Sequence, residues 1–268
     1  MGTVITLTTD FGSADGYVAA VKGVILNINP LATIIDITHQ ISPQNINQAA
    51  FVLSTTFPYF PPQTVHLVIV DPGVGTKRRA IILKTPQAYF VAPDNGVLSY
   101  IVRHYSSTMG INAELEAIAI TKAEYWLTPV SNTFHGRDIF APVAAHLSSG
   151  VPLRDFGEPL SSLTILPLSE IRTESDGSIV GRVIHIDVFG NLITNIRESD
   201  LPQRRFFINI GNESISGLSR NYTQGKKLVA LIGSSGYLEI AVREGNAAAH
   251  LNAAVGTEVK VIIQFQGR

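Results

Sequence analysis

The sequence contains no cysteine, which excludes disulfide bonds and thiolate metal sites. Charged residues make up only 15% of the chain, the formal net charge is −1, and no basic run occurs. Such a balance offers little electrostatic attraction to nucleic acid or to an anionic membrane surface. No uninterrupted apolar stretch reaches the ~18 residues of a membrane span. We therefore expect neither nucleic acid nor a membrane as a partner.

Two further absences bear on location and on metal chemistry. The N-terminal stretch MGTVITLTTDFG lacks the basic and long apolar regions of a signal peptide. Together with the lack of cysteine, this favours a reducing, cytoplasmic location. The histidines are scattered, and neither an H-x-x-x-H nor an H-E-x-x-H pattern occurs, so we expect no zinc site.

The chain has 268 residues, of which 45% are hydrophobic, so it can bury a sizeable core in one large or two modest domains. Its first half alternates short β-rich runs with helical patterns. Strands are expected at 4–9, 32–38 and 64–70, a strand hairpin at 79–93, and helices at 16–28, 45–57 and from 94 onward. This order predicts an α/β domain whose mostly parallel sheet is flanked by helices.

The second half has a different pattern. The segment 150–170 is rich in Pro, Gly and Ser and predicts a connection between domains. After it come β-rich runs separated by Gly, Asn and Ser turns, at 178–196, 204–218, 227–242 and 258–265. No helical pattern of useful length appears, which favours a small antiparallel barrel or sandwich. We expect an N-terminal domain over 1–165, a linker over 166–175 and a C-terminal domain over 176–268.

Three aspartates, Asp10, Asp71 and Asp94, stand at predicted strand ends. Ligands of open α/β sheets bind beyond the carboxyl ends of the strands, so this coincidence points to a site. Asp10 could hold a ribose diol, or it could be a turn residue, just as Asp15 could be a helix cap.

The stretch VDPGVGTKRRAI, residues 70–81, raises the same alternatives for Asp71. An Asx turn followed by glycines would explain it structurally. However, Arg78 lies seven residues further on, across a loop that can fold back, and an acid beside a guanidinium can orient a water molecule. Arg79 is an alternative partner, but the spacing from Asp71 favours Arg78.

His135 lies on a loop, before Gly136 and a helix that begins near Asp138, which makes it a better functional candidate than a histidine on an apolar face. In the second half, HIDVFGNLITNI and IGSSGYLEIAVREGNAA each combine an aromatic residue with amide and carboxylate groups. Such sets suit a purine and an amino-acid zwitterion, although hairpin turns with packing aromatics would give the same pattern.

Taken together, the motifs TLTTDFGSADGYVAAVKG, VDPGVGTKRRAI, APDNGVLS, TFHGRDIFAP, HIDVFGNLITNI and GSSGYLEIAVREGNAA make this chain resemble the S-adenosyl-L-methionine (SAM) hydroxide adenosyltransferase family. These SAM hydrolases are related to the SAM-dependent fluorinase and chlorinase, and the resemblance runs from about residue 3 to about residue 265. It implies an α/β N-terminal domain and a C-terminal β-barrel. It also implies homotrimers whose active sites lie between subunits.

The resemblance further implies that Asp71, Arg78 and His135 activate a water molecule that attacks C5′ of SAM and gives adenosine and L-methionine. We expect Asp71 to orient, Arg78 to stabilise the developing hydroxide and His135 to take the proton, with no metal and no cofactor. Asp10 matches a ribose contact, and Asp15 an acid near the methionine amino group. The remaining expected substrate contacts are Phe11, Asp94, Asn95, Thr133, Phe134, Asp187, Phe189, Asn191, Tyr222, Ser234, Tyr237, Glu239, Asn246 and Ala248.

Two alternatives remain open. The related halogenases lack the Asp-Arg-His set, and an aromatic residue stands where His135 stands here, so water rather than halide is the expected nucleophile. A non-catalytic SAM- or adenosine-binding protein would need no such set.

Overall fold

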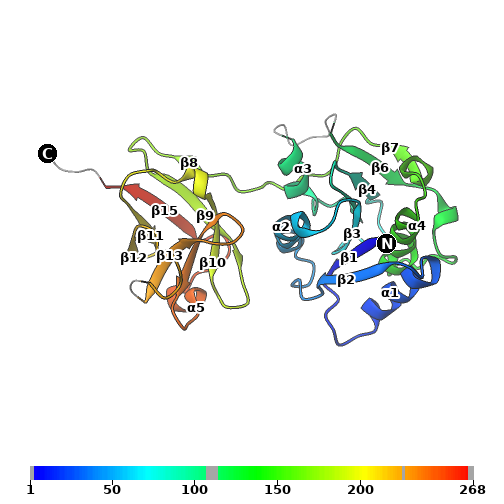
Figure 1. The fold of residues 1–268 in the computed structure, drawn as a ribbon, viewed down its shortest axis with the longest axis horizontal. Coiled ribbons are helices and arrows are strands. Elements are labelled where there is room, and N and C mark those ends of the chain that lie inside the picture. The colour runs from blue at the N-terminus through cyan, green and yellow to red at the C-terminus, as the bar shows by residue number, and fades with distance from the viewer. Residues whose placement is uncertain (1–2, 107–113, 225–226, 265–268) are drawn as a thin grey trace. The chain divides into compact units, whose positions relative to one another are not determined.

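The computed structural model describes residues 3–106, 114–224 and 227–264. The chain divides into two compact units, with the boundary between Leu166 and Pro167 (Figure 1). Within the described ranges, no helix is both long and apolar enough to cross a membrane. The fold class agrees with the prediction, an α/β unit followed by a β unit.

A seven-stranded sheet forms the middle of the N-terminal unit. Its strands are β1 (Val4–Thr9), β2 (Thr33–Thr38), β3 (Thr64–Ile69), β4 (Ala80–Lys84), β5 (Ala88–Pro93), β6 (Glu116–Ile120) and β7 (Gly157–Pro159). Their spatial order is β2-β1-β3-β5-β4-β6-β7. The first four are parallel, whereas β4, β6 and β7 join by antiparallel pairing. The sheet is therefore mixed, and the predicted hairpin is the β4–β5 pair.

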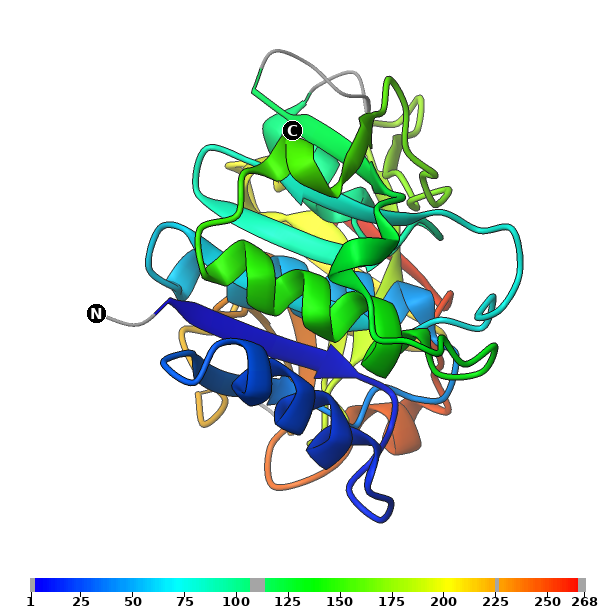
Figure 2. The same ribbon diagram turned by 90° about the vertical axis from the view of Figure 1, so that its right-hand side faces the viewer.

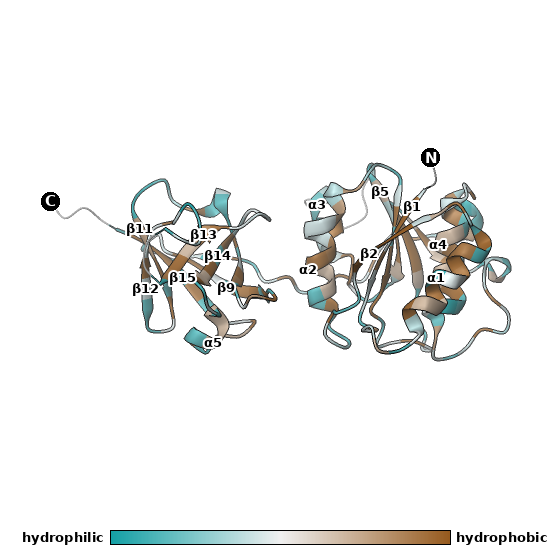
Figure 3. Cartoon of the chain, turned by 60° about the horizontal axis from the view of Figure 1, so that its bottom comes forward, coloured by the Kyte–Doolittle hydropathy of each residue, from teal (hydrophilic) through white to brown (hydrophobic). Residues whose placement is uncertain are grey.

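Helices cover both faces of this sheet (Figures 2 and 3). They are α1 (Tyr17–Ile28), α2 (Ile46–Thr56), α3 (Ser99–Tyr105) and α4 (Ala141–Ser148), with short turns η1 (Phe57–Tyr59), η2 (Ala123–Tyr125), η3 (Gly136–Phe140) and η4 (Leu153–Phe156). α1 and α4 pack on one face, where α1 buries Val21 and Ile25. α2 and α3 pack on the other face. Figure 3 shows apolar colour on the strands and on the helix sides that meet them.

The strand order explains why the predicted aspartates share one edge. β1, β3 and β5 are adjacent and parallel, so their carboxyl ends lie together. Asp10 follows β1, Asp71 follows β3 after Val70, and Asp94 follows β5. This edge is where ligands bind in open α/β sheets.

The C-terminal unit is an antiparallel sheet that nearly closes into a barrel. Its elements are β8 (Arg172–Thr173), β9 (Ile179–Ile186), β10 (Leu192–Arg197), η5 (Glu198–Asp200), β11 (Phe206–Ile210), β12 (Glu213–Ser216), β13 (Leu228–Ile232), β14 (Tyr237–Val242), α5 (Ala247–Leu251) and β15 (Glu258–Ile263). The strand path runs β12-β11-β15-β9-β10-β14-β13, with β8 paired to β9, and its two end strands touch one another. Inward-facing Ile, Leu and Val side chains fill the interior.

Two details differ from the sequence-based expectation for this half. A short helix, α5, is present although no helical pattern was expected there. It has only five residues, too few for an amphipathic period to show in the sequence. The last predicted run extended to Phe265, which lies outside the described residues, and β15 ends at Ile263.

Candidate active site

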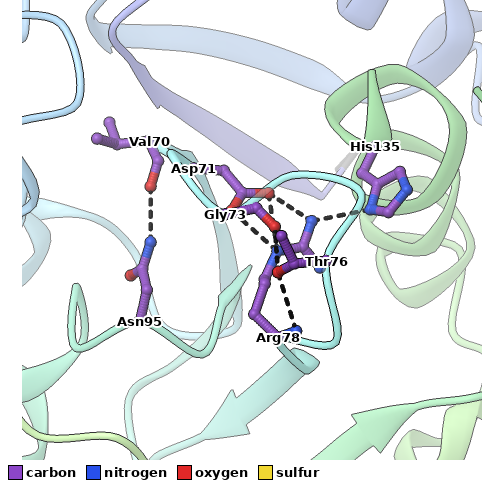
Figure 4. A network of polar contacts seen from close by, with 7 residues as sticks. All are labelled: Val70, Asp71, Gly73, Thr76, Arg78, Asn95 and His135. Atoms are coloured by element: carbon purple, nitrogen blue, oxygen red, sulfur yellow. Dashed lines mark hydrogen bonds and ion pairs between the residues drawn. The ribbon is translucent and has the colours of Figure 1, made fainter. Parts of the chain in front are cut away.

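The loop between β3 and β4 folds back on itself, so that Arg78 returns to Asp71 (Figure 4). The Arg78 Nε lies 2.9 Å from each carboxylate oxygen of Asp71, and Arg78 Nη2 also donates to Asp71 Oδ2. Both side chains are largely buried, at 6% exposure for Asp71 and 11% for Arg78. A bidentate, partly desolvated pair of this kind is geometrically well fixed. Arg79 instead pairs with Asp94, at 2.7 Å from Nε, which settles which arginine meets Asp71.

His135 completes a chain of three side chains. Arg78 Nη2 lies 2.9 Å from His135 Nδ1 (Figure 4). His135 immediately precedes the π-helical turn η3, a conformation that often occurs at functional sites. Gly75 makes the meeting possible: its φ is +75°, and a Cβ there would lie 2.3 Å from the carbonyl oxygen of Asn132. Only glycine lets the Asp71–Arg78 loop pack this closely on the loop that carries His135.

The contact with Arg78 also fixes the protonation of the imidazole. A guanidinium can only donate, so His135 Nδ1 must accept, and a neutral ring then carries its proton on Nε2. Burial and the Arg78 charge lower the pKa of His135, against the opposing effects of Asp71 and Asp138. The expectation that His135 takes the proton is therefore disfavoured in this geometry, because its Nδ1 lone pair is occupied and its protonation is opposed.

A pocket of about 240 Å³ opens beside this chain, and we call it the aspartate pocket. Its walls come from the ends of β1 and β3 and from the loop before η3, and its lining residues are Asp10, Phe11, Gln44, Ile69, Asp71, Pro72, Val74, Thr133, Phe134, His135 and Gly136. Asp71 and His135 face the pocket, whereas Arg78 is not among its walls. Arg78 thus fixes the two groups that a bound molecule would meet. Five predicted contacts, Asp10, Phe11, Asp71, Thr133 and Phe134, share this pocket with His135.

Aromatic side chains form one wall of the aspartate pocket. Phe11 and Phe134 meet edge to face at 5.7 Å between ring centroids, and Tyr17 packs on Phe134 at 5.3 Å. Such contacts hold the rings in fixed orientations. The pocket therefore combines a carboxylate end with a rigid apolar wall.

Sequence reasoning missed Gln44. Its backbone N–H donates to Asp10 Oδ2 at 2.8 Å, and Gln44 is one of the residues that line the aspartate pocket. Gln44 has a φ of 64°, a left-handed conformation that is unusual for a residue other than glycine. A glutamine between a proline and an asparagine carries no sequence signal for that conformation. Its strained backbone orients the Asp10 carboxylate.

Three predicted contacts of the N-terminal unit lie elsewhere. Asp94 is buried, with Arg79 on one oxygen and the Thr164 backbone N–H on the other at 2.8 Å. Asn95 donates to the carbonyl of Val70 at 2.9 Å (Figure 4). Both side chains brace the strand ends, and neither lines the aspartate pocket.

Asp15 is exposed in the loop before α1 and is also absent from the pocket walls. The alternative role as a helix cap is wrong for Asp15, because the N-cap of α1 is Gly16 and no side chain caps this helix. Within the described residues, the Asp15 side chain makes no hydrogen bond or ion pair.

In the C-terminal unit, a tight turn gathers several predicted contacts. Asp187 accepts from the backbone N–H groups of Phe189 and Asn191, and the Asn191 side chain returns to it at 2.9 Å. Gly190, with a φ of +84°, lies so close to Asn246 that a Cβ would overlap its amide. Asn246 caps α5 through the N–H of Ala249, and the Ala248 N–H donates to the carbonyl of Gly190. The turn holds Phe189 73% exposed.

A second group lies close to this turn. Tyr222 donates to Glu239 at 2.8 Å, and burial together with this carboxylate raises the pKa of Tyr222 to about 12. Burial also raises the pKa of Glu239, and Asp187 adds to the effect against the Tyr222 hydrogen bond. Ser234 is exposed on the turn before β14. Tyr237, by contrast, is buried, and its hydroxyl accepts a hydrogen bond from Arg197 Nη2 at 2.9 Å.

No group of three or more His, Asp or Glu side chains in the described ranges is arranged to hold a metal ion. The N-terminal cluster offers a carboxylate and a neutral imidazole, both held in place by a guanidinium. Such groups can orient a water molecule next to a ligand in the aspartate pocket.

Comparison with known proteins identifies the family. The model of the SAM hydroxide adenosyltransferase N-terminal domain matches residues 5–157, and that of the C-terminal domain matches residues 181–260. The chain belongs to the SAM hydroxide adenosyltransferase family. These matches span both units, which agrees with the motif order along the sequence.

Full-length relatives of this family carry specific names. Proteins named (R)-S-adenosyl-L-methionine hydrolase, from Salinispora tropica and Methanocaldococcus jannaschii, are each 38% identical, and the alignments cover 96% and 97% of this chain and 97% and 95% of theirs. A fluorinase from Nocardia brasiliensis is more distant, at 27% identity over 96% of both chains. A crystal structure of an uncharacterized conserved protein from Thermotoga maritima superposes with a TM-score of 0.87 at 38% identity, over 97% of this chain and 100% of that one.

Proposed function

We propose that this protein hydrolyses SAM to adenosine and L-methionine. The observation that carries the proposal is the chain Asp71–Arg78–His135, whose first and last members face the aspartate pocket. Relatives at 35–38% identity over nearly the whole chain are named (R)-S-adenosyl-L-methionine hydrolase, which supports the same activity here.

The main task of an enzyme in this reaction is to position the water molecule and the substrate. The sulfonium of SAM leaves as a neutral thioether, so C5′ is open to in-line displacement without a Lewis acid or a proton for the leaving group. In favourable cases, alignment of the reactants can supply roughly 7–11 kcal/mol of the barrier. Asp71 keeps lone pairs free besides those used by Arg78, so it can accept a hydrogen bond from the attacking water. Arg78 keeps Asp71 and His135 in register and adds positive charge beside the developing hydroxide.

The two units have different tasks in this proposal. Asp10, oriented by Gln44, suits the ribose hydroxyls, since one carboxylate can accept from both. In the C-terminal unit, Asp187, Asn191 and Glu239 offer acceptors for the methionine amino group, and the exposed Phe189 offers a face for adenine.

We further propose that the active form is a cytoplasmic homotrimer in which the substrate meets residues from two subunits. Support comes from the predicted substrate contacts, which fall on both units. Light scattering gives the oligomeric state. Mixing Arg78→Ala and Glu239→Ala proteins and allowing subunits to exchange should raise activity at low SAM concentration above the sum of the two unmixed proteins, because mixed trimers contain some intact sites. Monomeric protein with full activity would contradict this arrangement.

The decisive experiment is incubation of the purified protein with SAM, followed by chromatography. We expect adenosine and L-methionine in equal amounts, with release continuing through many turnovers. With chloride or fluoride present, a 5′-halogenated adenosine in place of adenosine would support halogenation instead. Stoichiometric binding of SAM without adenosine release over hours would support a sensor.

A further inference from the structure

A second hollow lies against Arg78 and His135, two of the same three side chains. It has a volume of about 280 Å³, and we call it the arginine pocket; its lining residues are Thr76, Arg78, Arg79, Ala80, Ala119, Ile120, Thr121, Trp126, Val130, His135 and Ile139. His135 lines both pockets, whereas Asp71 lines only the aspartate pocket and Arg78 only the arginine pocket. The hydrogen-bonded chain drawn in Figure 4 thus links a wall of the aspartate pocket to a wall of the arginine pocket.

The walls of the arginine pocket change from exposed to buried. Thr76, Thr121 and Val130 are exposed and form its rim. Ile120 and Ile139 are buried and form its base, next to Arg78 and His135. The hollow therefore leads from the surface of the N-terminal unit to the two side chains that would stand behind an attacking water molecule.

The chemistry of these walls suits water better than an organic ligand. Arg78 is paired with Asp71 and Arg79 with Asp94, so both guanidinium charges are already balanced. Trp126 contributes an indole whose buried Nε1 donor has no partner within the described part of the protein. Buried donors are normally satisfied by protein or by ordered water, and the hollow has room for several water molecules.

The proposed hydrolysis releases a proton that must leave the active site. As the C5′–O bond forms and the C5′–S bond breaks, the bonding pair goes to sulfur and the attacking water must lose one proton. Arg78 occupies the His135 Nδ1 lone pair, and a proton left on Asp71 would break the ion pair of Asp71 with Arg78, so the proton must pass on to solvent. Meanwhile the substrate itself would fill the aspartate pocket.

We propose that the arginine pocket is the solvent channel of the enzyme, which admits the water that is consumed and passes the released proton to bulk water. This inference rests on the proposed hydrolase function. Water hydrogen-bonded along the pocket carries the proton outward past Arg78 and His135, and the side chains end the cycle in the state in which they began.

The test narrows the channel at its rim, away from the proposed catalytic groups. Val130 is 36% exposed, so Val130→Trp can be accommodated by the fold while it fills the pocket mouth. We expect kcat to fall about fivefold or more, with KM within about twofold, and Val130→Leu to give a smaller loss. The solvent deuterium isotope effect on kcat should rise in Val130→Trp, because proton exit becomes slower. Thr121→Leu, at another exposed position of the arginine pocket, should act in the same direction.

Leu31→Trp is the control, since Leu31 is 79% exposed and lines neither pocket; it should keep the kcat and the isotope effect of the parent protein. The proposal is overturned if Val130→Trp and Thr121→Leu both keep the parental kcat. It is equally overturned if kcat falls with an unchanged isotope effect, since that result indicates distortion of the site. Parent protein that releases no adenosine from SAM would instead overturn the proposed function.

Discussion

The polar clusters of the two units differ in how their charges are balanced. In the N-terminal unit, the charges of Asp71 and Arg78 cancel within one hydrogen-bonded chain that ends on His135. In the C-terminal unit, Asp187 lies close enough to Glu239 to raise the pKa of Glu239. Among the described residues, no lysine or arginine side chain pairs with either carboxylate. The first cluster is complete by itself, whereas the second has acceptors in excess.

The difference teaches what each cluster is suited for. A self-neutralised cluster is rigid and can align a small neutral molecule without attracting a competing ion. A cluster with two carboxylates gains stability when a cationic group approaches, because that group relieves their repulsion. The contrast therefore separates a catalytic role, read in kcat, from a binding role, read in KM.

The largest effect is expected from breaking the first cluster at its centre. Arg78→Met leaves the buried Asp71 carboxylate unpaired and releases His135 from its orientation. We expect kcat to fall by about 10²–10⁴-fold, the range of general-base assistance, while adenosine affinity changes little. Arg78→Lys keeps the charge but loses the bidentate fork, so it should restore only part of the rate.

Steady-state kinetics with SAM and calorimetric titration with adenosine measure the two quantities separately. Thermal unfolding of Arg78→Met controls for loss of the fold. A variant that binds adenosine as poorly as it turns over SAM would show that Arg78 serves binding, and the contrast between the clusters would disappear.

The sequence predicted the parts of this architecture that depend on local pattern. Period-two and period-3.6 spacing located the strands and helices of the N-terminal unit, and strand-end position located Asp10 and Asp71. The pairing of Asp71 with Arg78 was one of the alternatives that the loop between them allowed, and the structure shows it. In each of these cases, the interaction that determines the structure lies within a short stretch of chain.

The parts that sequence could not predict depend on distant contacts. Asp94 has the same strand-end position as Asp71, yet Thr164 and Arg79 engage its carboxylate, and no local feature distinguishes the two. Gln44 reaches Asp10 through a left-handed backbone that its residue type does not suggest. The tautomer of His135 depends on Arg78, which is 57 residues away in the chain.

The second-largest expected effect is on the pH dependence of stability. It compares a buried base, His66, with a buried acid, Glu239. His66, on β3, is fully buried, bonds Thr6 at 2.7 Å and stacks on Phe90. Burial lowers its pKa to about 4. The folded state therefore binds fewer protons than the unfolded state between about pH 6.5 and pH 4. The free energy of unfolding should fall by about 3 kcal/mol as the pH drops through this window.

Urea unfolding of the parent protein and of His66→Asn from pH 7 to pH 4 tests this prediction. The asparagine variant starts less stable because of lost packing, but its stability should depend less on pH in this window. Parallel slopes for the two proteins would assign the acid sensitivity to other groups.

Glu239 is the buried acid, and its effect on the free energy of unfolding has the opposite pH dependence to that of His66. Because its pKa is raised in the fold, its contribution to stability is present at low pH and is lost as the pH rises through the folded value. Glu239→Gln should therefore make the protein more resistant to unfolding at neutral pH. It should also raise KM for SAM about tenfold, equivalent to about 1.4 kcal/mol, with kcat nearly unchanged.

Tyr222→Phe is the matched control, because it removes the hydrogen bond to Glu239 but leaves the carboxylate. It should raise KM less than Glu239→Gln does. A fall in kcat rather than a rise in KM for Glu239→Gln would give the C-terminal cluster a catalytic task and would remove the division of labour.

The smallest expected effect comes from Gln44. It distinguishes the strain of its left-handed backbone from its contribution to the aspartate pocket. Gln44 and Gln63 both have left-handed backbones in the N-terminal unit, with φ of 64° and 69°, but only Gln44 lines the aspartate pocket. Glycine at either position relieves the strain, so each variant should gain up to about 1 kcal/mol in the free energy of unfolding. Only Gln44→Gly should alter KM, because it deletes a pocket side chain while keeping the N–H that holds Asp10. Equal kinetics for both variants would reduce Gln44 to a backbone contact, and then the Asp10 carboxylate alone would define that end of the pocket.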